Sequence, residues 1–198
     1  MLPDLPSLIQ TIGYVGITAI VFAESGLFFG FFLPGDSLLF TAGFLASQGF
    51  LNIFILIALT TTAAILGDSV GYWFGKKVGP FIFSRPDSFL FSHKRVEDAS
   101  AFFAKHGPKS LILARFIPAV RTFTPILAGV GQMNYHTFLK YNVIGGILWG
   151  TGLPILGYFL GRLVPHPDRY IIPIVLLIIV VSILPVLREV FRKKKTNT

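Results

Sequence analysis

The sequence contains no cysteine, and only 13% of its 198 residues are charged. Without cysteine the chain has neither disulfide bonds nor thiolate chemistry, and its charged fraction is well below the roughly 25% of soluble domains. Apolar residues take their place: 53% of the chain is hydrophobic, 21 residues are phenylalanine and the mean hydropathy is +0.72. Because a chain inside a bilayer must satisfy its own backbone, these long apolar runs predict an all-α integral membrane protein with a single domain over residues 1–198.

Positive charge is missing from the first part of the chain, where no Lys or Arg precedes Lys76. The net charge of +8 comes mainly from the segment 76–109 and from the tail 188–198. Basic residues that flank apolar segments in this way follow the positive-inside rule. We therefore expect a multi-pass protein of the plasma membrane with a cytoplasmic basic tail at 188–198, and no nucleic-acid partner.

Two apolar segments are broken by glycine and proline, at about 24–46 and about 108–132. Neither offers the ~20 uninterrupted residues that a spanning helix needs. Each is therefore expected to be a re-entrant helical hairpin, which enters and leaves the membrane on one face. Such backbone is tolerated only where protein or a watery cavity covers it.

Three longer segments are predicted to span the membrane: 52–83, 135–163 and 170–187. The first of them should contain a kink or break near Gly67. A further segment, about 92–106, reads as an amphipathic helix on the membrane surface, with Ser92 as N-cap, Gly107 as C-cap and an apolar face formed by Val96, Ala99, Phe102 and Phe103.

An internal repeat relates the two halves of the chain at a constant offset of 86 residues. Ala42-Gly43 corresponds to Ala128-Gly129, and "GYWFGKKVGP" (71–80) corresponds to "GYFLGRLVP" (157–165). A constant offset indicates a duplicated unit, although glycine-rich membrane helices can also resemble one another by composition.

The charge distribution indicates that the two copies are inverted. With the loop 84–110 and the tail in the cytoplasm, the hairpin at 108–132 opens inward and the hairpin at 24–46 opens outward. We therefore predict an inverted repeat with two opposed hairpins. Paired broken segments in corresponding halves point to a transport site at the membrane midplane.

Five ionisable residues interrupt the apolar segments: Glu24, Asp36, Asp68, Arg115 and Arg121. Each would cost about 2.5–3.5 kcal/mol if it faced lipid at the bilayer centre. They should therefore face inward, with the two acids of the first hairpin opposite the two arginines of the second.

Two interpretations of this charged set stay open. The pairs could only fix the orientation of the hairpins, or they could form a polar site. Arginine binds phosphate with a rigid, permanently charged fork, and burial favours the neutral form of a carboxylate, so Glu24 or Asp36 could exchange protons. Asp68 could join them or cap the break at Gly67. Together these features are typical of a coupled transporter for an anionic ligand.

Two stretches carry a resemblance to a known family. "ESGLFFGFFLPGD" (24–36) and "RFIPAVR" (115–121), together with "GDSVGYWFGKKVG" (67–79), resemble the DedA family, also called the SNARE-associated or VTT-domain family. The resemblance covers nearly the whole chain. It implies opposed re-entrant hairpins, functional acids at Glu24 and Asp36, and functional arginines at Arg115 and Arg121.

The same resemblance implies a lipid translocase of the bacterial inner membrane. The expected activity is transport and recycling of undecaprenyl phosphate linked to the proton motive force, with the lipid and protons as partners. The alternative within the family is a flippase or scramblase of glycerophospholipids such as phosphatidylethanolamine. Whether the chain forms a homo-oligomer stays open.

Two signals point to a hydrolase instead. "GDSL" (35–38) and "GDSVG" (67–71) match serine-hydrolase signatures around Ser37 and Ser69. Such an elbow needs a strand–turn–helix setting and a histidine partner, but all four histidines fall in loops or at segment ends. A membrane hydrolase is thus the disfavoured alternative. We expect no enzyme activity, no cofactor and no metal site, since the histidines are isolated. Trp73 and Trp149 are expected to be interface or packing aromatics.

Overall fold

The computed structural model describes residues 5–27, 33–83, 103 and 105–163, and every element there is a helix. In chain order the elements are α1 (Leu5–Gly26), α2 (Gly35–Ser47), α3 (Ile53–Phe83), α5 (Ser110–Ala114), α6 (Pro118–Arg121), α7 (Phe123–Val130) and α8 (Tyr135–Leu163). The predicted span 170–187, the tail 188–198 and most of the amphipathic helix 92–106 lie outside the described residues. At the end of that last segment, Gly107 has φ +70° and donates its N–H to the Phe103 carbonyl, as a C-cap glycine does.

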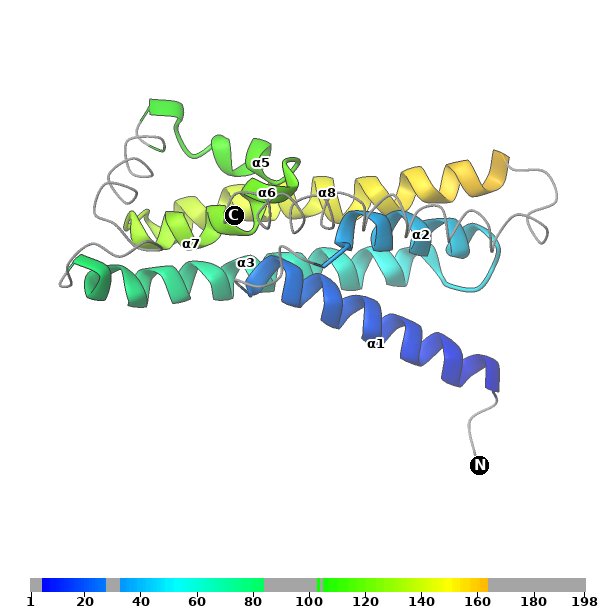
Figure 1. Ribbon diagram of the computed structural model, residues 1–198. Helices are drawn as coiled ribbons and strands as arrows, with labels where there is room; N and C mark the ends of the chain where they lie inside the picture. The colour runs from blue at the N-terminus through cyan, green and yellow to red at the C-terminus, as the bar shows by residue number, and fades with distance from the viewer. Residues whose placement is uncertain (1–4, 28–32, 84–102, 104, 164–198) are drawn as a thin grey trace, which may run out of the picture.

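Two long antiparallel helices, α3 and α8, form the axis of the bundle (Figure 1). Both begin at an asparagine N-cap: Asn52 Oδ1 accepts from Phe54 N at 2.9 Å, and Asn134 Oδ1 accepts from His136 N at 3.0 Å. Ile53–Val78 and Tyr135–Leu163 are long and apolar enough to cross a membrane. The structure thus confirms these two predicted helices.

Of the predicted kink or break near Gly67, the break is wrong, because α3 continues through Gly67 without interruption. Gly67 instead allows α1 to approach, since a Cβ at Gly67 would meet the Phe22 carbonyl and one at Gly26 would meet the backbone of Gly67. A residue without a side chain is therefore required at position 67 by the close packing of α1.

Two short helices pack on the long ones in a reciprocal way: α2 lies along α8, and α7 lies along α3 (Figure 1). Both begin near the middle of the bundle and run toward opposite ends. Gly43 of α2 approaches the backbone of Pro154, and Gly129 of α7 approaches the backbone of Tyr72. Gly43 and Gly129 are related by the 86-residue offset, whereas Pro154 and Tyr72 are 82 residues apart, so the two contacts correspond with a shift of about one turn along the long helices.

The glycines of the long helices complete this pattern. Gly157 of α8 approaches the Phe40 carbonyl, and Gly75 of α3 approaches the Ile126 carbonyl. Phe40 and Ile126 are themselves 86 residues apart. In each case a Cβ would overlap the facing backbone, so these contacts depend on glycine.

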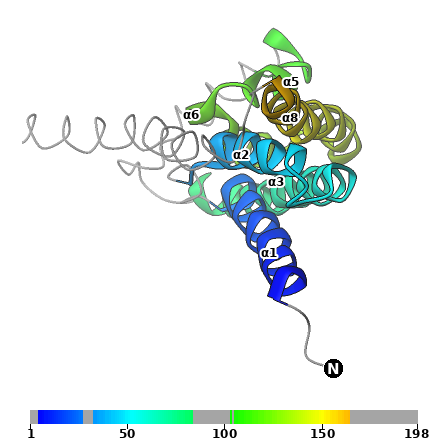
Figure 2. The same ribbon diagram turned by 90° about the vertical axis from the view of Figure 1, so that its right-hand side faces the viewer.

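The first broken segment differs in extent from the prediction. Helix α1 continues through Glu24 to Gly26 and α2 begins at Gly35, so the first residues of the predicted segment belong to α1, while the break lies between the two helices, among the glycines and the proline that predicted it. Near Gly26 α1 contacts α3, and toward its N-terminus it diverges from the bundle (Figure 2). Helices α5, α6 and α7 divide the second broken segment within the predicted bounds 108–132.

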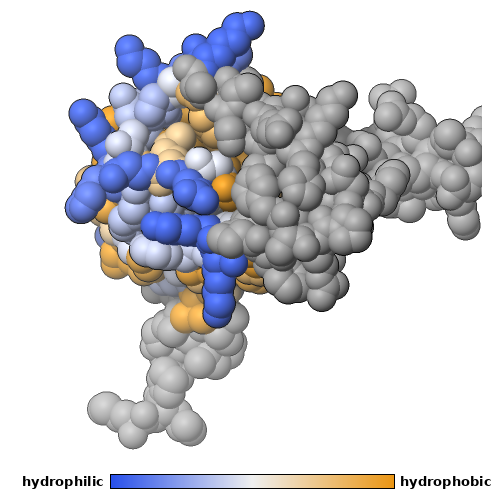
Figure 3. All heavy atoms as spheres, turned by 90° about the vertical axis from the view of Figure 1, so that its left-hand side faces the viewer, coloured by the Kyte–Doolittle hydropathy of each residue, from blue (hydrophilic) through white to orange (hydrophobic). Residues whose placement is uncertain are grey.

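The surface of the described part is divided between lysine and apolar side chains. Figure 3 shows hydrophilic residues gathered at the end of the bundle where α3 ends and α8 begins. The exposed lysines on these segments are Lys76, Lys77, Lys105, Lys109 and Lys140. Large apolar side chains are exposed along the long helices, among them Phe54, Leu66, Leu148 and Phe159. Apolar exposure on this scale is typical of a lipid-facing surface.

Candidate functional site

The predicted charged residues meet in the interior, near the middle of the long helices. Glu24 lies in the last turn of α1, Asp36 in the first turn of α2 and Arg121 at the end of α6, while Asp68 lies midway along α3 and Arg115 directly follows α5. Glu24, Asp68 and Arg115 are buried. The structure arranges the five residues in two groups.

The first group is centred on Arg121, whose guanidinium lies between two carboxylates. Nη2 donates to Glu24 Oε1 and Nη1 donates to Asp36 Oδ1. The side chains are exposed by 10% for Arg121, 2% for Glu24 and 40% for Asp36, so Asp36 is the accessible partner. Because Asp36 lies in the first turn of a helix, its charge is also favoured by the helix dipole.

Trp149 of α8 belongs to the same group. Nothing in the sequence indicated that Trp149 contacts the charged residues. Its indole Nε1–H donates to Asp36 Oδ1 at 2.7 Å, and its ring centre lies 4.9 Å from Arg121 Cζ. Trp149 also packs in the core, as predicted, and is only 3% exposed. Asp36 and Trp149 are 113 residues apart, and no sequence pattern links them.

Glu24 is enclosed on the side away from Arg121. Gly35 packs against the Glu24 carboxylate so closely that a Cβ at position 35 would overlap it. Among the described residues, Glu24 Oε2 is a buried oxygen without a hydrogen-bond donor. The glycine after Pro34 thus makes room for a carboxylate in addition to breaking the helix.

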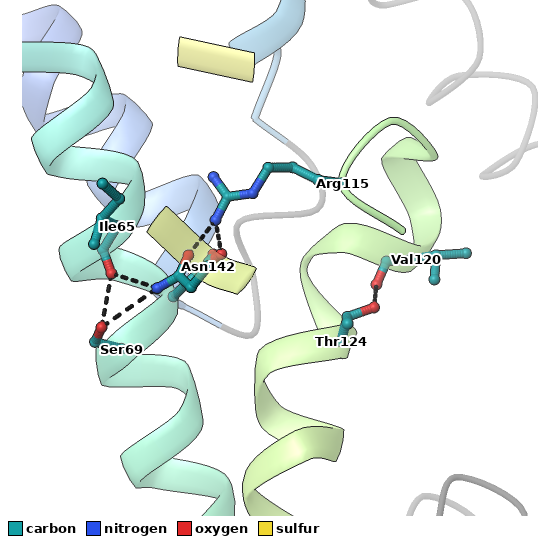
Figure 4. A network of polar contacts seen from close by, with 7 residues as sticks. Ile65, Ser69, Arg115, Val120, Thr124 and Asn142 are labelled. Atoms are coloured by element: carbon teal, nitrogen blue, oxygen red, sulfur yellow. Dashed lines mark hydrogen bonds and ion pairs between the residues drawn. The ribbon is translucent and has the colours of Figure 1, made fainter. Parts of the chain in front are cut away.

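The second group is centred on Arg115 (Figure 4). Its Nη2 donates to Asp68 Oδ2 and to Asn142 Oδ1, the latter at 2.5 Å. The Asn142 amide donates in turn to the Ile65 carbonyl at 3.0 Å, which fixes its orientation. The expectation that Glu24 and Asp36 face both arginines therefore holds for Arg121 alone, because the ionic partner of Arg115 is Asp68.

A small cavity separates the two groups. Its volume is about 20 Å³, and Asp68, Arg115, Arg121, Asn142 and Trp149 are among its lining residues. This is room for about one water molecule. The two arginines therefore face one shared cavity, which is too small in this conformation for a phosphate group.

The hydrolase alternative finds no support in the described residues. Ser37 lies in the first turn of α2 and Ser69 lies within α3, so neither occupies a strand-to-helix elbow. Ser69 Oγ donates to the Ile65 carbonyl at 2.8 Å. The described residues also contain no group of three or more metal-ligating His, Cys, Asp or Glu side chains.

Comparison with known proteins adds independent information. Residues 33–159 match the VTT domain family. The chain is 45% identical to the protein DedA of Escherichia coli K12 over 184 residues, which covers 92% of this chain and 84% of that protein. It is 46% identical to an uncharacterised membrane protein of Mycobacterium leprae over 168 residues, covering 85% and 75%. It is 38% identical to the inner membrane protein YqjA of E. coli K12 over 160 residues, covering 79% and 71%. No solved structure matches the chain.

Proposed function

The chain belongs to the DedA family of VTT-domain membrane proteins, and from this premise we propose that it is a lipid translocase of the bacterial inner membrane that transports undecaprenyl phosphate together with protons. The observation that carries the proposal is the Arg121 guanidinium, buried between the Glu24 and Asp36 carboxylates. A guanidinium fork binds carboxylate and phosphate by the same geometry. An internal carboxylate and a phosphate can therefore compete for it.

Competition of this kind couples the anion to a proton. When Asp36 takes up a proton it loses its charge and most of its attraction to Arg121. The phosphate then pairs with Arg121, and loss of the proton from Asp36 restores the carboxylate and expels the phosphate. One proton enters for each anion bound, and Glu24 keeps Arg121 paired throughout.

The reciprocal packing of α2 on α8 and α7 on α3 supports a transport cycle. We propose that the two halves form an inverted repeat whose hairpins open toward opposite faces of the membrane. The exposed lysines at the end where α3 ends mark that end as cytoplasmic under this proposal. Because the central cavity measures only about 20 Å³, it must widen before it can hold a phosphate group.

The hydrocarbon chain of the lipid has a matching surface. An apolar groove of about 430 Å³ lies between α1 and α3, lined by residues that include Thr18, Ala19, Phe22, Leu59 and Ala63. Apolar cavities of about 150 Å³ already bind benzene. Phe22 and Ala63 of the groove belong to the same core cluster as Trp149, which contacts the charged residues. We propose that part of the lipid chain lies in this groove while its phosphate reaches Arg121.

Binding of the purified protein to undecaprenyl phosphate, measured by native mass spectrometry, tests the proposal. Phosphatidylethanolamine serves as competitor, the Arg115→Ala/Arg121→Ala variant removes both arginines, and Lys140→Ala removes an exposed lysine as control. We expect binding that the double variant loses and Lys140→Ala retains. Equal binding of both lipids by all three proteins would contradict the proposal and favour a glycerophospholipid flippase or scramblase.

A further inference from the structure

We infer that the indole N–H of Trp149 and Nη1 of Arg121 together form the binding site for one oxygen of the phosphate, a site that Asp36 Oδ1 occupies in this conformation. The inference rests on the proposed function, since it names a further ligand of the same anion. It assigns Trp149 a direct contact with the substrate.

The geometry of Asp36 Oδ1 carries the inference. Two donors from different helices converge on this single oxygen: Arg121 Nη1 at the end of α6 and Trp149 Nε1, at 2.7 Å, from the middle of α8. Both donors are buried, with Trp149 3% exposed and the Arg121 side chain 10% exposed. Such a pair of donors is a preformed anion site, because buried N–H groups of fixed direction favour a negatively charged oxygen between them.

The indole cannot be left alone when Asp36 departs. A buried donor without an acceptor is destabilising, since it loses its hydrogen bond to water and gains none in return. Ile17, Phe22 and Leu153 pack against the core cluster that contains Trp149, and all three are apolar side chains. The cavity that Trp149 lines has room for only about one water molecule, so an incoming phosphate oxygen competes with that water for the indole N–H at the position that Asp36 leaves.

Asp36, rather than Glu24, is the carboxylate that exchanges. Its side chain is 40% exposed, whereas that of Glu24 is 2% exposed and enclosed by Gly35. Departure of Asp36 therefore needs no rearrangement of α1. The Trp149 ring lies 4.9 Å from Arg121 Cζ, and this cation–π contact keeps the guanidinium in place while Nη1 changes its acceptor.

The test uses farnesyl phosphate, an isoprenyl monophosphate, with farnesol as the uncharged control. The chain has two tryptophans, so Trp73→Phe leaves Trp149 as the only indole. Trp73 is about half exposed and lies outside the charged site, which makes this variant a suitable background. In it, the single indole N–H resonance reports directly on Trp149, and native mass spectrometry gives the affinity.

We expect farnesyl phosphate, but not farnesol, to shift the indole resonance. Trp149→Phe keeps a ring over Arg121 but removes the N–H donor. It should weaken the binding of farnesyl phosphate about tenfold and leave the binding of farnesol unchanged. Asp36→Ala removes the carboxylate that competes for the two donors and should tighten the binding of farnesyl phosphate about tenfold. Arg121→Ala should abolish binding. Melting temperatures confirm that each variant is folded, and if Trp149→Phe does not fold, the shift of the indole resonance in the Trp73→Phe background decides.

Two results would overturn the inference. If Arg121→Ala abolishes binding while Trp149→Phe and Asp36→Ala bind as the background does, the phosphate contacts Arg121 but not the indole, and the proposed function survives. If the folded background protein binds neither farnesyl phosphate nor undecaprenyl phosphate, the proposed function fails together with the inference.

Discussion

Arg121 donates to Glu24 across 97 residues of sequence and joins the end of α6 to the end of α1. Glu24 is almost fully buried, and its second carboxylate oxygen has no donor among the described residues. An ionised carboxylate in such surroundings needs a paired cation, since an isolated buried charge is strongly unfavourable. Arg121 is thus required twice, once to hold the two segments together and once as the proposed contact of the phosphate.

Arg121→Lys separates the charge of this residue from its shape. An ammonium group can pair with Glu24 but cannot contact Glu24 and Asp36 through the two parallel nitrogens of a fork. We expect a folded protein that loses at least about 90% of its undecaprenyl phosphate transport into proteoliposomes, because one charge-assisted hydrogen bond accounts for roughly a tenfold effect. Lys140→Arg, an exchange of the same kind at an exposed position, is the control. Unchanged transport by Arg121→Lys would show that a point charge is sufficient.

The Arg115–Asp68 pair should behave differently, because it is buried on both sides and anchored by Asn142. Asp68→Ala leaves a buried guanidinium without its counterion and should destabilise the protein by about 3–5 kcal/mol. Asp68→Ala combined with Arg115→Ala removes both charges, so its loss should be smaller than the sum of the two single losses. Thermal unfolding in detergent measures all three variants.

Transport by the Asp68→Ala/Arg115→Ala variant decides whether Arg115 also contacts the anion. Arg115 lines the central cavity, so we expect this variant to recover stability without recovering transport. Full recovery of both would show that Arg115 is a structural partner of Asp68 alone.

The sequence predicted those parts of the fold that depend on local pattern. Apolar length identified α3 and α8, and the constant offset of 86 residues identified Gly43 and Gly129 as equivalent before their packing was seen. The broken segment was predicted to begin at about Glu24, although α1 continues to Gly26, because a carboxylate within an apolar segment looks like a boundary. Glu24 is helical and buried because Arg121, far away in sequence, neutralises it.

The partners of the other charged residues could not be predicted either, because they too lie far apart in the sequence. Trp149 is an ordinary packing aromatic by sequence, and only the tertiary structure brings its N–H to Asp36. Asn142 did leave a signal, as the single amide in the apolar helix α8, and a polar residue at such a position indicates a buried partner. The pairing of Arg115 with Asp68 likewise depends on how α3 and α8 pack around the residue that follows α5, which no local pattern predicts.

The reciprocal glycine contacts give a prediction about the two halves of the bundle. Gly43→Ala and Gly129→Ala should destabilise the protein by similar amounts, about 1–3 kcal/mol each, because both place a methyl group against facing backbone. Gly152→Ala is the matched control in α8, since no atom lies within 4 Å of the position that its methyl group would take. Its unfolding temperature should stay the same or rise, as alanine favours a helix over glycine. Unequal losses at Gly43 and Gly129 would contradict the equivalence of the two contacts.

The apolar groove gives a prediction about how much the hydrocarbon chain of the lipid, as distinct from its phosphate, contributes to binding. Ala19 lines the groove and is exposed, so Ala19→Phe should occupy part of its volume without disturbing the core. We expect weaker binding of undecaprenyl phosphate, by about 15-fold to 60-fold if two or three methylene contacts of ~0.8 kcal/mol each are lost. Gly16→Phe adds the same ring to α1 at a position with no neighbour within 4 Å and should leave binding unchanged. If both variants bind undecaprenyl phosphate like the parent, the lipid chain lies elsewhere. Binding of inorganic phosphate is measured on the same proteins. If Ala19→Phe loses it relative to the parent, the ring has disturbed the charged site itself.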